Sequence, residues 1–169
     1  MSVKQADISG KPAVFRRATA VGRILLARET VKKMRDGSLE KGDPLAISKT
    51  MAILAAKNAP GSLALCHPLR IENVDVVETV LDDSVVVEVT VSAHEKTGVE
   101  MEALAAVSAA LLNIWDVVKA YEKDGQGQYP ATSIEGIRVV EKVKRSEVPG
   151  PASARISRPQ GKRSPTASG

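Results

Sequence analysis

Four charged side chains stand in an otherwise apolar stretch between residues 100 and 119. Glu100 and Glu102 come at the front of this Ala-rich stretch, and Asp116 and Lys119 lie three residues apart near its end. Carboxylates and amines are groups that transfer protons in many enzymes, so these positions are candidates for acid–base chemistry. The alternative for Asp116 and Lys119 is an exposed ion pair, which at this spacing stabilises a helix by only about 0.2–0.5 kcal/mol.

The spacing of these charges limits what one helix could do with them. At about 100° per residue, Glu102, Asp116 and Lys119 fall within about a 100° sector of one helical face, and Glu100 points nearly the opposite way. Fourteen residues separate Glu102 from Asp116, which is about 21 Å along a helix axis, so one straight helix cannot bring both to one reacting centre. If both belong to one site, two such helices from different subunits pack antiparallel. They would meet along the small, mostly apolar residues between the charged ends, which are Ala105, Ala109, Leu112 and Asn113.

Further candidates lie outside this stretch. In the segment Leu65-Cys66-His67-Pro68-Leu69, His67 could donate to a phosphate or exchange a proton near neutral pH. The alternative is a loop histidine bonded to backbone, beside a buried and inert Cys66. Lys41 stands just before Asp43-Pro44, a helix start whose free amides favour an anion. Three other cations could equally be solvated or belong to a site: Arg16, Lys57 and Lys142.

Composition excludes several classes of function. With one Phe, one Trp and two Tyr, the chain lacks the stacking aromatics that single-stranded nucleic-acid binding commonly uses. The formal net charge of +4 equals the four cations of residues 148–169, which contain no Asp or Glu, so residues 1–147 are balanced and predict no nucleic-acid partner. One Cys and two His exclude an internal disulfide framework and a Cys/His zinc site, and we predict no metal. We see no leader and no run of about 18 apolar residues, which predicts a cytoplasmic, soluble protein without a membrane partner.

The periodicity predicts an α+β fold with one catalytic domain, residues 1–147, and a disordered basic Pro/Ser/Gly-rich tail, residues 148–169. Strands are expected at 14–27, 70–80, 84–95 and 134–143, and helices at 28–36, 44–57 and 98–123. In the third strand Val85, Val87, Val89 and Val91 alternate onto one face. The first strand could also be a helix, because Ala and Arg are good helix formers. Thr97 and Glu100 match a capping box for the long helix. This order is the ferredoxin-like split βαβ arrangement with an extra helix, in which an antiparallel sheet carries its helices on one face.

Four segments together resemble the MoaC-type cyclic pyranopterin monophosphate synthase family of molybdenum cofactor biosynthesis. They are Lys41-Gly42-Asp43, Leu65 to Leu69, Lys96 to Leu104, and Asp116 with Lys119, and the resemblance covers about residues 6–143. It implies an enzyme, a lyase without redox cofactor, that rearranges (8S)-3′,8-cyclo-7,8-dihydroguanosine 5′-triphosphate to cyclic pyranopterin monophosphate and diphosphate. It also implies a homohexamer, a trimer of dimers with the site at the dimer interface. Magnesium could travel with the triphosphate, although no residue requires it.

The resemblance also implies residue roles. Asp116 is the central acid/base, Lys119 is its partner, and Lys41 joins them as a catalytic residue that also lies among the basic positions around the triphosphate and base. The substrate-binding residues implied are Leu65, Cys66, His67, Met101, Glu102, Arg16, Lys142 and Glu100, the last of which could instead serve only as the helix cap. The chain departs from the family pattern in a longer connection at 125–133 and in the segment after the last strand, on which the role of Lys142 depends.

Two other classes of function stay open at this point. One is a non-catalytic nucleotide- or RNA-binding module of ferredoxin-like fold, which would need an aromatic or basic sheet face that residues 70–95 do not show. The other is a structural oligomer in which Asp116 and Lys119 only form an ion pair between subunits. Turnover of the cyclised nucleotide would separate both from the enzyme.

Overall fold

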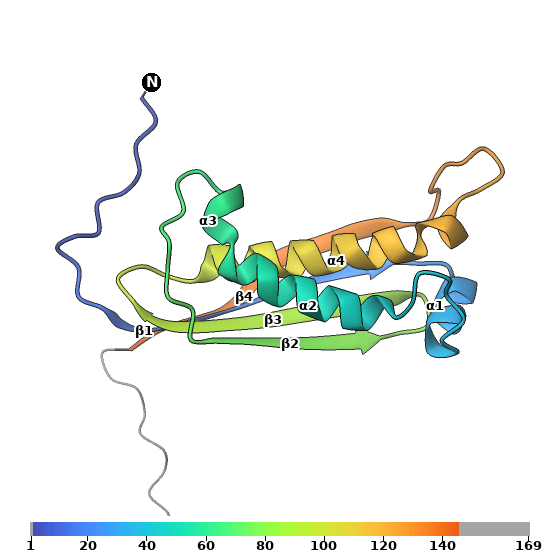
Figure 1. The fold of residues 1–169 in the computed structure, drawn as a ribbon, viewed down its shortest axis with the longest axis horizontal. Coiled ribbons are helices and arrows are strands. Elements are labelled where there is room, and N and C mark those ends of the chain that lie inside the picture. Colours follow the sequence, from blue (N-terminus) through green and yellow to red (C-terminus); the bar gives the residue numbers. More distant parts are fainter. Residues whose placement is uncertain (1, 146–169) are drawn as a thin grey trace, which may run out of the picture.

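The chain folds into a four-stranded antiparallel sheet with helices on one face (Figure 1). The structure is a computed structural model that describes residues 2–145. The strands are β1 (Val14–Leu25), β2 (Asn73–Val80), β3 (Ser84–Glu95) and β4 (Ser133–Arg145). The helices are α1 (Arg28–Arg35), α2 (Pro44–Lys57), α3 (Ala59–Ser62) and α4 (Glu100–Glu122). The sheet order β2-β3-β1-β4 confirms the predicted split βαβ arrangement. The tail predicted at 148–169 lies outside the described residues.

The core lies between the sheet and two helices, α2 and α4, which run side by side over it (Figure 1). Alternate residues of β3 point into this core, as the valine alternation predicts: Val85, Val87, Val89 and Val91 are fully buried. Residues Val14–Leu25 form the strand β1, so the helix considered for this segment is wrong. The core face of β1 carries small residues, which lets α4 pack close to the strand. A Cβ at Gly22 would come within 2.7 Å of Leu111 and 2.8 Å of Val107 on α4, so only glycine fits there.

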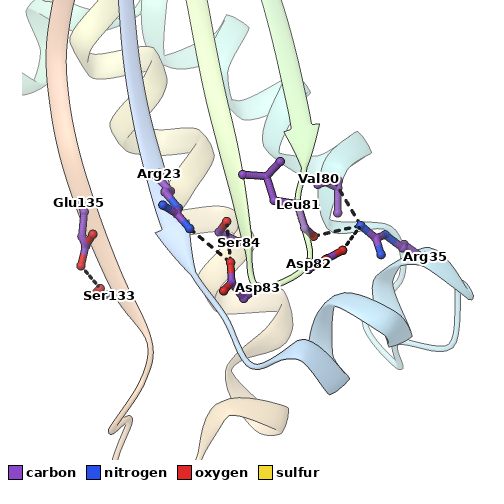
Figure 2. Close-up of polar contacts among 9 residues, drawn as sticks. All are labelled: Arg23, Arg35, Val80, Leu81, Asp82, Asp83, Ser84, Ser133 and Glu135. Carbon is purple, nitrogen blue, oxygen red and sulfur yellow. Dashed lines mark hydrogen bonds and ion pairs between the residues drawn. The ribbon is translucent and has the colours of Figure 1, made fainter.

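Helix α1 is fixed to the turn between β2 and β3 at one end of the sheet (Figure 2). The Arg35 guanidinium donates to the carbonyls of Val80 and Leu81, at 3.4 and 3.1 Å, and lies 3.5 Å from the Asp82 carboxylate. Across the same turn, Arg23 of β1 pairs with Asp83 at 3.3 Å. These contacts set where the chain leaves α1 toward Lys41.

Helix α2 begins as the Asp43-Pro44 pair predicts. The Asp43 side chain accepts a hydrogen bond from the backbone N–H of Leu45 at 2.8 Å, and Pro44 occupies the first turn. The one-turn helix α3 was not among the predicted helices. Proline is tolerated in the first turn of a helix, where its missing N–H costs no hydrogen bond, and this permits the extra turn.

Helix α4 does not begin with the predicted capping box. Its N-cap residue is Val99, and within residues 2–145 no side chain caps that first turn. The Glu100 carboxylate forms an ion pair with Lys142 of β4 instead of bonding back to Thr97, because a cation stabilises a carboxylate more than one further amide does. At its other end, α4 is held by Glu122, whose carboxylate accepts from the Ala27 N–H at 3.1 Å and the Thr132 hydroxyl at 2.5 Å.

By length and composition α4 could cross a membrane, because an 18-residue window of it has a mean hydropathy of 1.5. Half of that window is buried inside the fold, and its inward face packs on β1, β3 and β4. A core helix of a soluble protein passes the same test.

Candidate active site

Near the end of α4, two lysines hold the carboxylate of Asp116. Lys119 donates to Asp116 Oδ1 at 2.7 Å from one turn further along the helix. Lys41 reaches in from the loop between α1 and α2 and donates to Asp116 Oδ2 at 3.0 Å and to its main-chain oxygen at 2.8 Å. The structure therefore brings together all three residues that the resemblance implies to be catalytic. Lys41 faces this carboxylate and not the N-terminus of α2, where an anion contact was one expectation.

The two lysines set the protonation of this cluster. The hydrogen bonds from Lys119 and then from Lys41 hold the pKa of Asp116 below its usual value, and the hydrogen bond to Asp116 raises the pKa of Lys119. The carboxylate of Asp116 is therefore ionised and the amine of Lys119 protonated at neutral pH. The side chain of Asp116 is 58% exposed and that of Lys119 is 45% exposed, so a ligand can reach both.

At the front of α4, Glu102 lies in the interior. It is 1% exposed, and its Oε1 accepts a hydrogen bond from the Cys66 thiol at 3.3 Å. Its second oxygen, Oε2, is buried without a hydrogen-bond partner among the described residues. Burial raises the pKa of Glu102, and burial together with the neighbouring carboxyl group raises the pKa of Cys66 to about 11. The thiol stays protonated at neutral pH, so it is a hydrogen-bond donor and not a nucleophile in this state.

The three residues predicted to share one sector of α4, Glu102, Asp116 and Lys119, differ in exposure. Asp116 and Lys119 face solvent, whereas Glu102 stands at the edge of the sector where the buried face of α4 begins, next to Ala103. The segment containing Cys66 covers it from outside. Helical angles alone could not indicate this, because the covering segment lies 36 residues earlier in the chain.

A strongly basic pocket opens beside the front of α4. It has a volume of about 410 Å³ and contains Arg16, Lys142, Glu100 and Met101, four of the residues implied to bind substrate. Arg16 is held in place by the carbonyls of Glu95 and Lys96, each at 3.3 Å. The lining also contains Thr97, Gly98 and three lysines that were not among the predicted site residues: Lys11, Lys96 and Lys144. Lys144 could have been predicted from the sequence, because it follows Lys142 by two residues on β4 and residues two apart on a strand share a face.

The Leu65–His67 segment lies under the N-terminal residues of the chain. Gln5 donates to the carbonyls of Leu65 and Cys66 at 3.4 and 3.3 Å. His67 Nε2 donates to the Ala6 carbonyl at 2.8 Å, and its other ring nitrogen, Nδ1, has no hydrogen-bond partner among residues 2–145. The backbone-bonded loop histidine that sequence reasoning kept as an alternative is therefore present, and a free ring nitrogen remains for a ligand. Lys57, the remaining cation considered, lies in a small surface hollow beside β2, apart from these clusters.

An apolar groove lies along the outer face of α4 from Met101 to Leu112, beside residues of α2 and α3. It has a volume of about 530 Å³, and its floor is made of small side chains that include Ala105, Ser108 and Ala109. Met101 and Leu112, at its two ends, are 43% and 60% exposed. Exposed apolar surface of this kind commonly marks a protein contact.

Comparison with known proteins identifies the family of this chain. The model of the MoaC family matches residues 5–144, and the chain belongs to that family. A probable cyclic pyranopterin monophosphate synthase from Pyrococcus horikoshii is 52% identical over 142 residues, covering 84% of this chain and 89% of that protein. Probable synthases of the same name from Sulfurisphaera tokodaii and Methanococcoides burtonii are each 51% identical, over 83% of this chain and 93% and 88% of their own lengths.

Proposed function

We propose that this chain is a cyclic pyranopterin monophosphate synthase, a lyase of molybdenum cofactor biosynthesis. Its substrate is the 3′,8-cyclised dihydro-GTP, and its products are cyclic pyranopterin monophosphate and diphosphate. The observation that carries the proposal is the Asp116 carboxylate held between Lys41 and Lys119, in a chain about half identical to relatives of that name over most of its length. The catalytic unit is the domain of residues 1–147, and we place it in the cytoplasm, where nucleotide substrates are made.

The proton transfers are assigned to the Asp116 cluster. Opening and reclosing C–N bonds requires a group that accepts a proton and a group that donates one, and an ionised carboxylate beside a protonated amine supplies both. While both lysines are bonded to it, Asp116 is a weak base because its pKa is lowered. A phosphate that competes for Lys41 would remove one of these bonds, and the pKa of Asp116 would rise toward the range in which it accepts a proton.

The triphosphate is assigned to the basic pocket at the front of α4. Its lysines and Arg16 can hold a polyanion and stabilise the charge that develops on the departing diphosphate. Glu100 reduces the net charge of this pocket through its ion pair with Lys142, so a phosphate group that displaces Glu100 would find a cation already in place.

One complete site requires two copies of the chain. About 21 Å along α4 separates Glu102 from Asp116, so the basic pocket and the Asp116 cluster of one copy are two halves of different sites. If two α4 helices pack antiparallel along the apolar groove, the front of each lies beside the end of the other. A two-fold contact of this kind is the commonest way in which identical chains associate, and we propose that three such dimers form a hexamer.

The direct test is turnover of the cyclised nucleotide, supplied by the radical enzyme that makes it. The purified full chain should convert it to a pterin that becomes fluorescent after oxidation, with one diphosphate released per pterin. Glu29→Gln is a matched control, because it neutralises an exposed carboxylate on α1, away from both halves of the site. If the wild-type chain forms no pterin while a relative assayed in parallel does, the proposed function is wrong.

A further inference from the structure

The Lys41 amine belongs to the Asp116 cluster only because the loop that carries it is held against α4. Lys41 lies in the loop between α1 and α2, 75 residues before Asp116, and its side chain is 45% exposed. A long, exposed lysine keeps one partner only if its own backbone is fixed. Whatever fixes residues 36–43 therefore controls the contact between Lys41 and Asp116.

Both ends of this loop are anchored. At its start, Arg35 ties α1 to the β2–β3 turn, as Figure 2 shows. Leu39 is 7% exposed and belongs to the hydrophobic core. At its end, Gly42 has a φ of +96° and donates to the Leu39 carbonyl at 3.2 Å, immediately before the Asp43 cap of α2. Between the Leu39 anchor and that turn, only the backbone of residues 40 and 41 is left to be held.

Tyr121 of α4 makes that contact. Its hydroxyl oxygen accepts a hydrogen bond from the backbone N–H of Glu40 at 3.1 Å, one residue before Lys41. The Tyr121 ring is packed against the hydrophobic core, and the amine of Lys33 lies over it, 5.5 Å from its centroid. Because Tyr121 and Asp116 are on the same helix, this bond joins the backbone beside Lys41 to the element that carries the carboxylate.

We propose that Tyr121 is a positioning residue of the synthase: its hydroxyl, bonded to the Glu40 amide, holds Lys41 in contact with Asp116. Tyr121 touches no reacting atom in this proposal and acts only through Lys41. The effect on turnover rests on the proposed function, whereas the effect on the Lys41–Asp116 contact does not.

Tyr121→Phe tests the proposal, because it removes only the hydroxyl and keeps the ring under Lys33. We expect kcat to fall about three- to tenfold, the range that the loss of one hydrogen bond gives. The pKa of Asp116, followed by carboxyl ¹³C NMR, should rise part of the way to its value in Lys41→Met. In the double variant Tyr121→Phe/Lys41→Met, both the pKa and any residual turnover should equal those of Lys41→Met alone, because two residues that act through one contact are not additive.

Lys33→Met is the matched control. It removes the cation–π contact of the Tyr121 ring and leaves the hydroxyl and the packing of the ring on the core in place. We therefore expect kcat within about twofold of wild type and a pKa of Asp116 close to its wild-type value. The positioning role is wrong if Tyr121→Phe leaves the pKa of Asp116 at its wild-type value. It is also wrong if Tyr121→Phe lowers turnover by the same factor in the wild-type chain and in Lys41→Met. If the wild-type chain has no synthase activity but Tyr121→Phe still shifts the pKa of Asp116, the proposed function fails and the positioning stands.

Discussion

The two ends of α4 place carboxylates in opposite environments. At the front, Glu102 is 1% exposed, touches the Cys66 thiol and has a raised pKa. Near the other end, Asp116 is open to solvent, is bonded to two lysines and has a lowered pKa. The surroundings of each carboxyl group, and not its chemical type, set the direction in which its pKa shifts. The front combines a carboxyl group of raised pKa with a basic pocket, and the other end holds the groups to which we assign proton transfer. In the proposed function each end is half of a site.

The largest expected effect comes from removing the charge at the open end. Asp116→Asn keeps the shape of the side chain but cannot accept a proton from the substrate, so kcat should fall by on the order of 10³ in the pterin assay. Unfolding temperature should stay near wild type, because exposed ion pairs contribute little to stability. Turnover within tenfold of wild type would remove Asp116 from its assigned role.

The next effect tests whether the apolar groove joins the two ends across a dimer. Leu112→Asp places a charge on the most exposed large side chain of the groove, where a packed partner would bury it. An unpaired buried charge is costly, so we expect dissociation in analytical ultracentrifugation and at least about a tenfold loss of turnover. Val77→Asp is the control, since Val77 is 51% exposed on β2 and belongs neither to the groove nor to the contacts that fix the Lys41 loop. If the Leu112 variant keeps the assembly and activity of the Val77 variant, α4 is not the dimer contact.

A mixing experiment tests whether each site takes one end from each copy. Asp116→Asn damages one half-site and Arg16→Ala damages the other, and each variant alone should be nearly inactive. Dissociated and reassembled together, they should recover roughly a quarter of wild-type activity, because half of the dimers are mixed and each mixed dimer has one intact site. If the mixture is no more active than its parents while mass spectrometry detects mixed dimers, both halves of the site come from one chain.

The smallest effect concerns the buried end and appears as a pH dependence of stability. Burial raises the folded-state pKa of Glu102 above its ordinary value of 4.5, so the folded chain binds a proton that the unfolded chain has lost. Stability from this group is fully present below pH 4.5 and decreases as pH rises toward the raised folded pKa. Glu102→Gln should remove that part of the slope and be relatively more stable at neutral pH. Parallel stability curves for the two proteins in chemical denaturation would show that Glu102 ionises normally.

Local patterns predicted the elements because each is decided by neighbouring residues. The valine alternation of β3 and the Asp43-Pro44 start of α2 depend on contacts within a few positions, and both are confirmed. The capping box failed because its Glu100 is paired with Lys142, 42 residues later on β4. A local motif is a weak guide when a charge from another strand reaches the same side chain.

The site was predictable only in part, for the same reason. The angle and rise of a helix were enough to show that Glu102 and Asp116 cannot share a reacting centre in one chain. They could not show that the Cys66 segment buries Glu102, or that Lys41 reaches Asp116 from 75 residues away. Grouping Lys41 with Asp116 came from the resemblance to a family, and its geometry came from the structure.

The pairing of β1 has a consequence for how the chain folds. The first strand to be synthesised pairs with the last two, β3 and β4, and not with β2, the next to be made. Every hydrogen-bonded neighbour of β1 therefore waits for chain that emerges later, and such distant pairing makes folding slow. Until β4 joins the sheet, the apolar α4 lacks part of the surface that covers it, and a chain stopped before Ser133 should aggregate instead of folding.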